Sequence, residues 1–169
     1  ADRWILSRAQ AVIREATASL EQFRLEEAAK RCFEFAWNEL ADWYVEAVKP
    51  RMTGAAAATP QAVLAYCFDL ALRLLHPVVP FITEELWQKL PTRTAGELLA
   101  VAAWPGARPE LEDPRADQEF GRVKIAIEHI RSIRAEYRVA PKTKLKATIV
   151  ARGNDKAAMF GGERDTVVG

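Results

Sequence analysis

The chain has 169 residues, of which half are hydrophobic and 28% are charged, and its formal net charge is +1. This composition can bury a sizeable core, but the net charge provides no overall field that would attract nucleic acid. A nucleic-acid surface would therefore require basic residues gathered in one region. No apolar run approaches the roughly 18 residues of a membrane span, and the charged start differs from a signal peptide. We expect a cytoplasmic protein with no membrane contact.

The residue types that carry metal or catalytic chemistry are few and scattered. Cys32 and Cys67 lie far apart and form no CxxC motif, so we expect two reduced thiols and neither a disulfide nor a zinc site. Neither His76 nor His129 follows a glutamate by three residues, as the metal ligands of a di-metal bundle would. A phosphate loop of the form GxxxxGK[ST] is absent. We expect no metal, no cofactor and no catalytic residue in this chain, and we interpret His76 as a helix-end residue.

The first third of the chain predicts two amphipathic helices, because apolar residues recur at steps of three and four. The first stripe consists of Ile5, Ala9, Val12, Ala16, Leu20 and Phe23. The second stripe consists of Phe33, Trp37, Leu40, Tyr44 and Ala47. Pro50 disfavours helical geometry at Lys49, so the second helix is expected to end there.

Three further helices are predicted after a loop over residues 52–60. The third helix starts near Pro60, and the fourth runs from Pro80 to about residue 90. Residues 91–114 contain four of the nine prolines and predict an ordered crossover on the bundle surface, with an apolar anchor at 101–104. Asp113 and Pro114 suit the start of a fifth helix, which VAP at 139–141 should end.

The hydrophobic period then changes from near four to two between residues 145 and 151, as in a half-buried strand. The sequence therefore predicts an all-α bundle of about five helices over residues 1–141, followed by the start of a small α/β (strand–helix) appendage over residues 142–169. The chain enters a helical pattern at its first residue and stops at the tail GGERDTVVG, so we expect it to belong to a longer protein.

Phe35 is the first candidate for a binding surface. If Phe33 marks the buried face of a regular α-helix, Phe35 lies near the opposite pole together with Arg31 and Asn38. An exposed ring flanked by a guanidinium and an amide suits an unpaired base, and such stacking contributes about 1–3 kcal/mol. The alternative is that the fifth helix or the crossover covers this face, which would make Phe35 an ordinary core residue.

The second candidate is a basic stripe on the fifth helix. Residues 121–146 contain eight basic residues and only two acidic ones, Glu128 and Glu136. Charge this segregated is typical of a surface that contacts phosphates. The alternative is a solvated helix face that the two glutamates partly pair. Arg14 and Arg24, which precede the fifth helix in the chain, are compatible with either interpretation. The basic stripe itself consists of Lys124, Arg131, Arg134 and Arg138.

Three segments together resemble a known family. WNELADWYVEAVKPR, HPVVPFITEELWQKLP and IRSIRAEYRVAPKTKL, in this order and with these separations, closely resemble the C-terminal anticodon-binding region of bacterial valyl-tRNA synthetases. The likeness covers nearly the whole chain. The middle segment alone would indicate the related synthetases for branched aliphatic amino acids, whereas the other two favour the valine enzyme. The ATP-binding signatures of the family, HIGH and KMSKS, are missing, as is an editing domain.

The resemblance implies a helical bundle that binds the anticodon stem-loop of tRNA(Val). Arg31, Phe35 and Asn38 would belong to its binding surface. ATP-dependent aminoacylation with valine, together with the ATP and Mg that it uses, would belong to the parent valine–tRNA ligase and not to this chain. The implied partners are the tRNA and the remainder of the synthetase chain, and we expect a monomer.

Two other function classes remain open. One is a structural or protein-docking bundle with no RNA contact, whose association would be nearly insensitive to salt. The other is a free-standing enzyme, which would need a convergent polar site that the sequence does not reveal.

Overall fold

The computed structural model describes residues 1–140 and 143, except residues 92 and 95. The described residues are mostly helical, and the prediction of an all-α bundle of about five helices is confirmed. The predicted appendage over residues 142–169 lies, apart from Thr143, outside the described residues. None of the helices in the described part of the chain combines the length and the apolar character needed to cross a bilayer.

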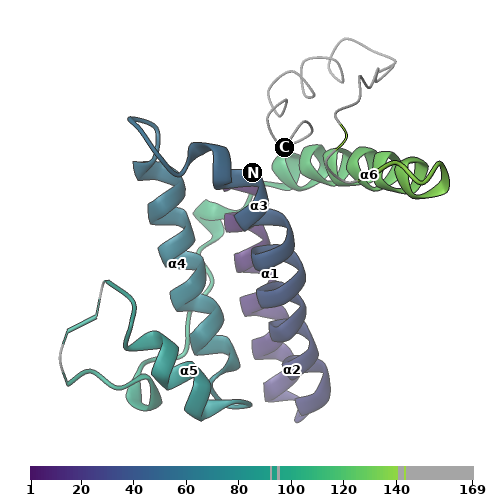
Figure 1. Cartoon of the computed structure of the whole chain (residues 1–169). Helices are drawn as coiled ribbons and strands as arrows, with labels where there is room; N and C mark the ends of the chain where they lie inside the picture. Colours follow the sequence, from purple (N-terminus) through teal and green to yellow (C-terminus); the bar gives the residue numbers. More distant parts are fainter. Residues whose placement is uncertain (92, 95, 141–142, 144–169) are drawn as a thin grey trace.

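The long helices α1, α2 and α4 lie side by side, α5 lies at one end of them, and α6 projects from the other end (Figure 1). Short helical turns complete the chain between these helices. The elements are α1 (Asp2–Glu21), α2 (Leu25–Glu34), η1 (Phe35–Val45), α3 (Glu46–Val48), η2 (Lys49–Arg51), α4 (Ala58–Leu75), α5 (Pro80–Trp87), η3 (Leu99–Val101), η4 (Pro109–Leu111) and α6 (Pro114–Glu136).

The first apolar stripe is buried from Ile5 to Ala16, but it ends before Phe23. The prediction that Phe23 belongs to the core is wrong, because its side chain is 88% exposed. The reason is that α1 ends at Glu21, so Phe23 no longer follows the helical period.

The turn after α1 is a Schellman motif, which satisfies the last carbonyl groups of the helix. The amide of Arg24 donates to the carbonyl oxygen of Ser19 at 2.8 Å, and the amide of Phe23 donates to that of Leu20 at 3.0 Å. Phe23 has a φ of 57° and occupies the left-handed position that is usually glycine. A side chain with a Cβ costs about 1–2 kcal/mol in this conformation.

The second helix is continuous from residue 25 to residue 48, but its middle part, η1, is a π-helix of 11 residues. Two predictions about this helix are wrong. Phe33 and Trp37, predicted as core, are 58% and 60% exposed. Phe35, predicted to face outward, is 1% exposed and lies in the main hydrophobic cluster.

The π-helical segment explains both errors. A π-helix pairs residues five apart and not four apart, so it shifts the buried face relative to a regular α-helix. The predicted stripe is spaced for an α-helix throughout. It therefore matches the buried face from Leu40 onward and is out of register before that residue. The buried residues of this helix are Ala28, Cys32, Phe35, Leu40, Tyr44, Ala47 and Val48, with a step of five between the third and the fourth.

Polar contacts fix the second helix against α1. The carboxylate of Asp2 accepts hydrogen bonds from Arg51 at 2.7 and 2.9 Å and from the hydroxyl of Tyr44 at 3.0 Å. Further along α1, the guanidinium of Arg8 donates two hydrogen bonds of 2.9 Å to Glu39. Such paired, charge-assisted bonds define the orientation of both partners.

The crossover after α5 lies on α1 and α4 through polar side chains. Gln10 is fully buried, its Oε1 accepts from the amide of Arg108 at 2.8 Å, and its Nε2 donates to the hydroxyl of Tyr66 at 3.3 Å. The indole of Trp104 donates to the hydroxyl of Thr17 at 2.9 Å. A buried amide with both ends satisfied determines the path of the crossover, because any other path would leave it unpaired.

The apolar anchor of the crossover differs in part from the predicted one at 101–104. Leu99, not Val101, is buried, and it packs with Trp87 of α5. The carboxylate of Glu84 accepts from the amide of Leu99 at 3.0 Å, whereas the side chain of Val101 is exposed.

Both cysteines are free and buried. Burial raises the pKa of the Cys32 thiol to about 11 and that of the Cys67 thiol to about 12, so both stay protonated at neutral pH. Within the described residues, no three His, Cys, Asp or Glu side chains gather in a way that could hold a metal ion. His76 lies at the end of α4, where its Nδ1 is 2.8 Å from the hydroxyl of Thr83 in α5.

Replacing Phe35 and Phe33 separately tests the corrected register. Phe35→Ala should lower the free energy of unfolding by about 3–5 kcal/mol, because it leaves a cavity in the core. Phe33→Ala should lower it by less than about 1 kcal/mol, because most of that ring is in solvent. Urea unfolding measures both values, and equal losses would contradict the π-helical register.

Asp2 should make the stability of the fold sensitive to acid. Although burial opposes it, hydrogen bonds from Arg51 and Tyr44 lower the pKa of Asp2 from its ordinary value of 3.8. A depressed pKa stabilises the fold above the unfolded-state value, and this stabilisation is lost as the pH falls through the folded-state value.

We therefore expect Asp2→Asn to destabilise the fold by about 1–2 kcal/mol at pH 7. The difference from the unmodified protein should shrink as the pH is lowered below about 4. Thermal unfolding from pH 7 to pH 2 measures this. Asp42→Asn, which changes an exposed carboxylate of η1, is the control and should leave the profile unchanged.

Candidate nucleic-acid interface

The start of α6 is held firmly on α1. The predicted cap is confirmed, because the side chain of Asp113 accepts from the amide of Ala116 at 3.0 Å. The hydroxyl of Ser7 in α1 accepts from the amide of Asp113 and donates to the carboxylate of Asp117, both at 3.0 Å. The ring of Phe120 stacks on Trp4 with 4.1 Å between centroids. Beyond these contacts α6 leaves the bundle (Figure 1).

Trp43 of η1 connects the second helix to the basic face of α6. The ammonium of Lys124 lies 4.9 Å from the centre of the Trp43 ring and 5.6 Å from that of Trp4. The guanidinium of Arg131, two turns further along α6, lies 5.4 Å from the Trp43 ring. In the described part of the chain, no carboxylate forms an ion pair with either cation. Aromatic rings therefore position these two cationic side chains, and no carboxylate among the described residues neutralises their charge.

The other two predicted basic residues lie where α6 ends. Arg134 donates to the carbonyl oxygens of Ala140 at 2.8 Å and Thr143 at 3.1 Å, which ties the following turn to the helix. Arg138 has a φ of 51° and an exposed side chain. It occupies the position in the turn after α6 that Phe23 occupies after α1.

The cations predicted on α1 and α2 are each paired with carboxylates. Arg31 lies 3.4 Å from Glu15 and 3.3 Å from Glu34. Arg14 pairs with Glu112 of the crossover, and Arg24 lies 3.1 Å from Glu27. These three side chains are exposed, but their charge is already balanced locally.

On the second helix, the predicted polar residue lies at the surface, whereas the predicted aromatic residue does not. Asn38 is exposed, as predicted. Phe35 is removed from the candidate site, because its ring is enclosed in the core. Its place is taken by Phe33 and Trp37, whose rings stack on each other with 6.1 Å between centroids and 10° between planes. The sequence signal that could have located this pair is the step of five between the apolar residues 35 and 40.

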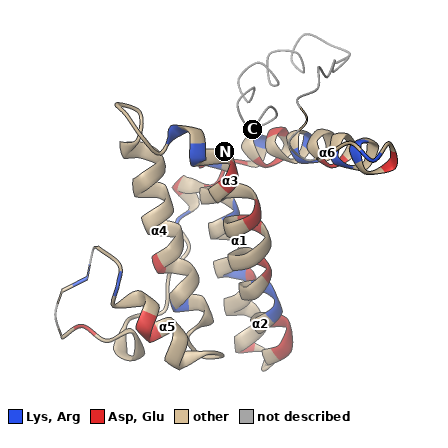
Figure 2. Cartoon of the chain, in the orientation of Figure 1, with Lys and Arg blue, Asp and Glu red and all other residues tan. Residues whose placement is uncertain are grey.

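The two parts of the interface have opposite charge. Residues 25–48 of the second helix contain six acidic and two basic residues, whereas residues 121–140 contain two acidic and five basic ones. Figure 2 shows the basic positions of α6 outside the bundle and the acidic positions along the second helix. Phosphates should therefore be attracted to α6, and the second helix can offer aromatic and amide contacts but little attraction for a phosphate backbone.

A family model described as the anticodon-binding domain of tRNA ligase matches residues 2–149. The chain belongs to this family. This match confirms the resemblance that the three sequence segments predicted.

Relatives of this anticodon-binding domain include bacterial valine–tRNA ligases. It is 43% identical over 148 residues to that of Fervidobacterium nodosum and 41% identical over 148 residues to that of Thermotoga maritima, which in each case is 88% of this chain. It is 40% identical over 168 residues, 96% of this chain, to that of Clostridium acetobutylicum. The chain spans 17–19% of the length of these relatives.

Removing Trp43 should loosen the middle of α6. In Trp43→Ala, the backbone amides of residues 124–131 should exchange with deuterium at least several-fold faster, because their side chains lose the ring that holds them. The amides at the start of α6 should keep their protection, since the stack of Phe120 on Trp4 remains. Trp104→Ala, which removes an indole at the other end of the bundle, should leave exchange in α6 unchanged.

Proposed function

We propose that this domain binds the anticodon stem-loop of tRNA(Val) and holds it so that the catalytic part of a parent valine–tRNA ligase can attach valine to the distant acceptor end. The family match and the identity of the relatives support the assignment to a ligase. ATP and Mg would act in the parent enzyme. We expect a monomer that works in the cytoplasm.

At the level of residues, the proposal rests on one difference between the cations, namely whether a carboxylate pairs with them. Arg14, Arg24 and Arg31 are paired with glutamates, whereas Lys124 and Arg131 rest on aromatic rings. A cation without a carboxylate partner can neutralise a phosphate and thereby release cations that are condensed on the RNA, and this release contributes a large part of the affinity. In this proposal α6 therefore contacts the backbone, and Arg138 extends its basic face.

The exposed pair of Phe33 and Trp37 would receive an unpaired base of the loop. Single-stranded RNA is read by stacking bases on aromatic side chains and by hydrogen bonds to their edges. Asn38, next to Trp37 in the chain, offers an amide that donates and accepts such bonds. The acidic surroundings of this pair would keep the phosphate backbone away and leave the base as the group in contact.

The salt dependence of binding tests the role of α6. A stem-loop RNA with the tRNA(Val) anticodon should bind with an affinity that falls by a slope of about 0.7–0.9 per contacted phosphate on a log–log plot against salt. Lys124→Gln with Arg131→Gln should weaken binding and reduce the slope by about 1–2. Arg14→Gln with Arg24→Gln is the matched control and should change the slope little. An affinity that does not change with salt concentration would favour a protein-docking bundle instead.

The same assay tests the aromatic pair. Phe33→Ala and Trp37→Ala should each weaken binding by about 1–3 kcal/mol at constant salt slope, because they remove stacking and no charge. Circular dichroism confirms that the variants are folded. Unchanged affinity in both folded variants would exclude the pair from the interface.

A further inference from the structure

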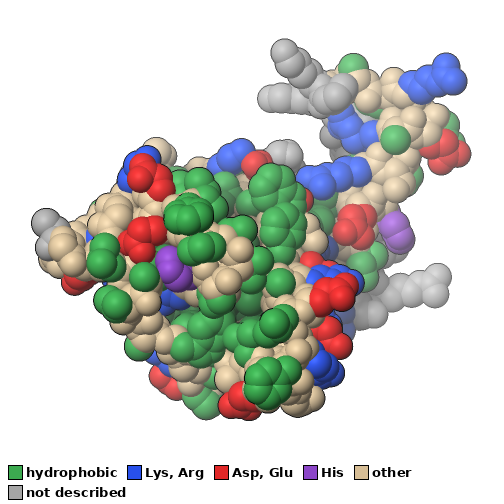
Figure 3. Space-filling view, turned by 90° about the horizontal axis from the view of Figure 1, so that it is seen from below, with side chains coloured by type: hydrophobic (Ala, Val, Ile, Leu, Met, Phe, Trp, Pro, Cys, Tyr) green, Lys and Arg blue, Asp and Glu red, His purple; other side chains and the backbone are tan. Residues whose placement is uncertain are grey.

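The end of the bundle opposite α6 exposes an unusual amount of apolar surface. We call this surface the apolar end. Figure 3, which looks at the molecule from below, shows hydrophobic side chains gathered over it. Phe81 is 92% exposed and Phe23 is 88% exposed. The remaining members come from the start of α2, the α4–α5 turn and the start of α5. The apolar end consists of Phe23, Leu25, Val78, Val79, Phe81 and Ile82.

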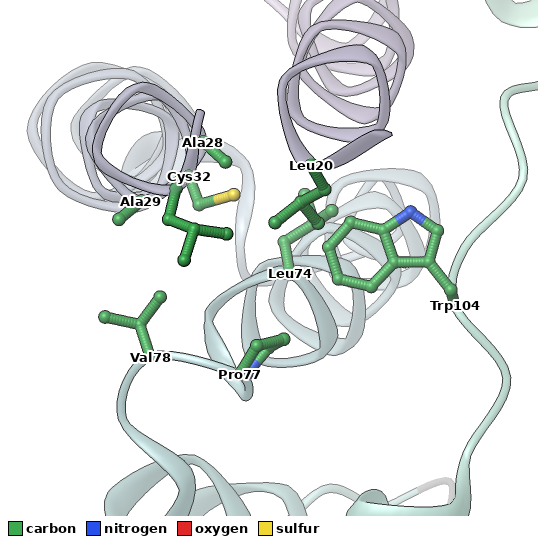
Figure 4. A pocket seen from close by; sticks show the side chains of 9 residues that line it. Leu20, Ala28, Ala29, Cys32, Leu74, Pro77, Val78 and Trp104 are labelled. Atoms are coloured by element: carbon green, nitrogen blue, oxygen red, sulfur yellow. The ribbon is translucent and has the colours of Figure 1, made fainter. Parts of the chain in front are cut away.

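A pocket of about 110 Å³ lies at the apolar end, between the start of α2 and the α4–α5 turn. Figure 4 shows Leu20 of α1, Cys32 of α2 and Leu74 of α4 at its centre, with Val78 and Trp104 at its sides. Leu25 also lines this pocket. Leu25, at the start of α2, and Val78, in the α4–α5 turn, therefore line the same depression although they are far apart in the sequence. A contiguous apolar surface of this kind is typical of a protein interface.

The conformation of Phe23 is a second, independent observation. An aromatic residue stands in the left-handed position of a Schellman turn, where glycine would be free of strain. In the chain by itself this residue strains the backbone and also exposes its ring to water. A partner that covers the ring would remove its exposure to water and offset the cost of the strained backbone.

The charges around the apolar end disfavour RNA as that partner. Glu26 and Glu27 lie in the first turn of α2, and Glu84 and Glu85 lie in α5 directly after the exposed residues. Arg24 pairs with Glu27 and Lys89 pairs with Glu85, whereas Glu26 and Glu84 form no ion pair among the described residues. The two unpaired carboxylates repel phosphates and suit a protein surface bordered by lysine or arginine.

We infer that the apolar end packs against the body of the parent ligase, on an apolar surface bordered by basic residues. This inference rests on the proposed function in one respect, namely that the chain is a domain of a larger ligase. The relatives are more than five times as long as this chain, so most of their mass lies outside it. Docking at this end leaves α6, at the opposite end, free for RNA (Figure 1).

Side-chain footprinting with hydroxyl radicals tests this in the full-length ligase that carries the domain. Phe23 and Phe81 should be oxidised at least 10-fold more slowly in the full-length ligase than in this chain alone. Phe33 and Trp37 should react equally in both without RNA, which makes them the internal control. Equal oxidation of Phe23 and Phe81 in the two proteins would overturn the inference. Protection in this chain alone that grows with its concentration would do so too, because the occupant would then be a second copy.

A pair of variants separates docking from folding. Phe23→Gly should raise the melting temperature of this chain alone, because glycine relieves the left-handed strain. In the full-length ligase the same change should increase the oxidation of Phe81 several-fold. Tyr137→Ser, which replaces another exposed aromatic residue directly after α6, should leave that oxidation unchanged. No increase in the full-length Phe23→Gly protein would overturn the role of Phe23 in docking.

Addition of the anticodon stem-loop distinguishes this inference from the proposed function. If RNA protects neither Trp37 nor α6 while Phe23 and Phe81 remain protected in the full-length ligase, the RNA interface is wrong and the docking surface stands. If RNA protects Trp37 but Phe23 and Phe81 are as reactive as in this chain alone, the docking surface is wrong and the RNA interface stands.

Discussion

The change from α-helical to π-helical pairing at Phe35 is the constraint on which the rest of the structure depends. It brings Phe35, Leu40 and Tyr44 into the same core although their spacing does not fit an α-helix. The same change places Phe33 and Trp37 at the surface. π-helical segments are rare and occur often at functional sites. Here the segment determines which aromatic rings are available to a ligand.

Buried polar contacts then determine where α6 lies. Ser7 joins both the cap and the first turn of α6 to α1, and Gln10 fixes the crossover that leads to it. These side chains would be unsatisfied in any other arrangement, so they specify one direction for α6 even though few of its residues are buried. Trp43 extends this support to Lys124 and Arg131. A helix that is mostly exposed can thus present its cations at a fixed place.

The two ends of the bundle are different kinds of surface. One end carries cations on a projecting helix, which suits a flexible, charged ligand. The other end carries large apolar side chains bordered by carboxylates, which suits a rigid protein surface. In the proposed function, the RNA and the catalytic body of a parent ligase would contact opposite ends of the bundle.

The sequence by itself determined the helix order, the cap at Asp113, the free thiols and the family, since these follow from local spacing, residue chemistry and motifs. It also indicated the basic character of α6. It placed Phe33, Phe35 and Trp37 on the wrong faces because periodicity was evaluated for an α-helix, whereas the buried face is selected by packing against α1 and α4. Only the tertiary structure decided which arginines are neutralised by glutamates and which cations rest on Trp43. Those pairings join residues up to about a hundred positions apart, which no local pattern encodes.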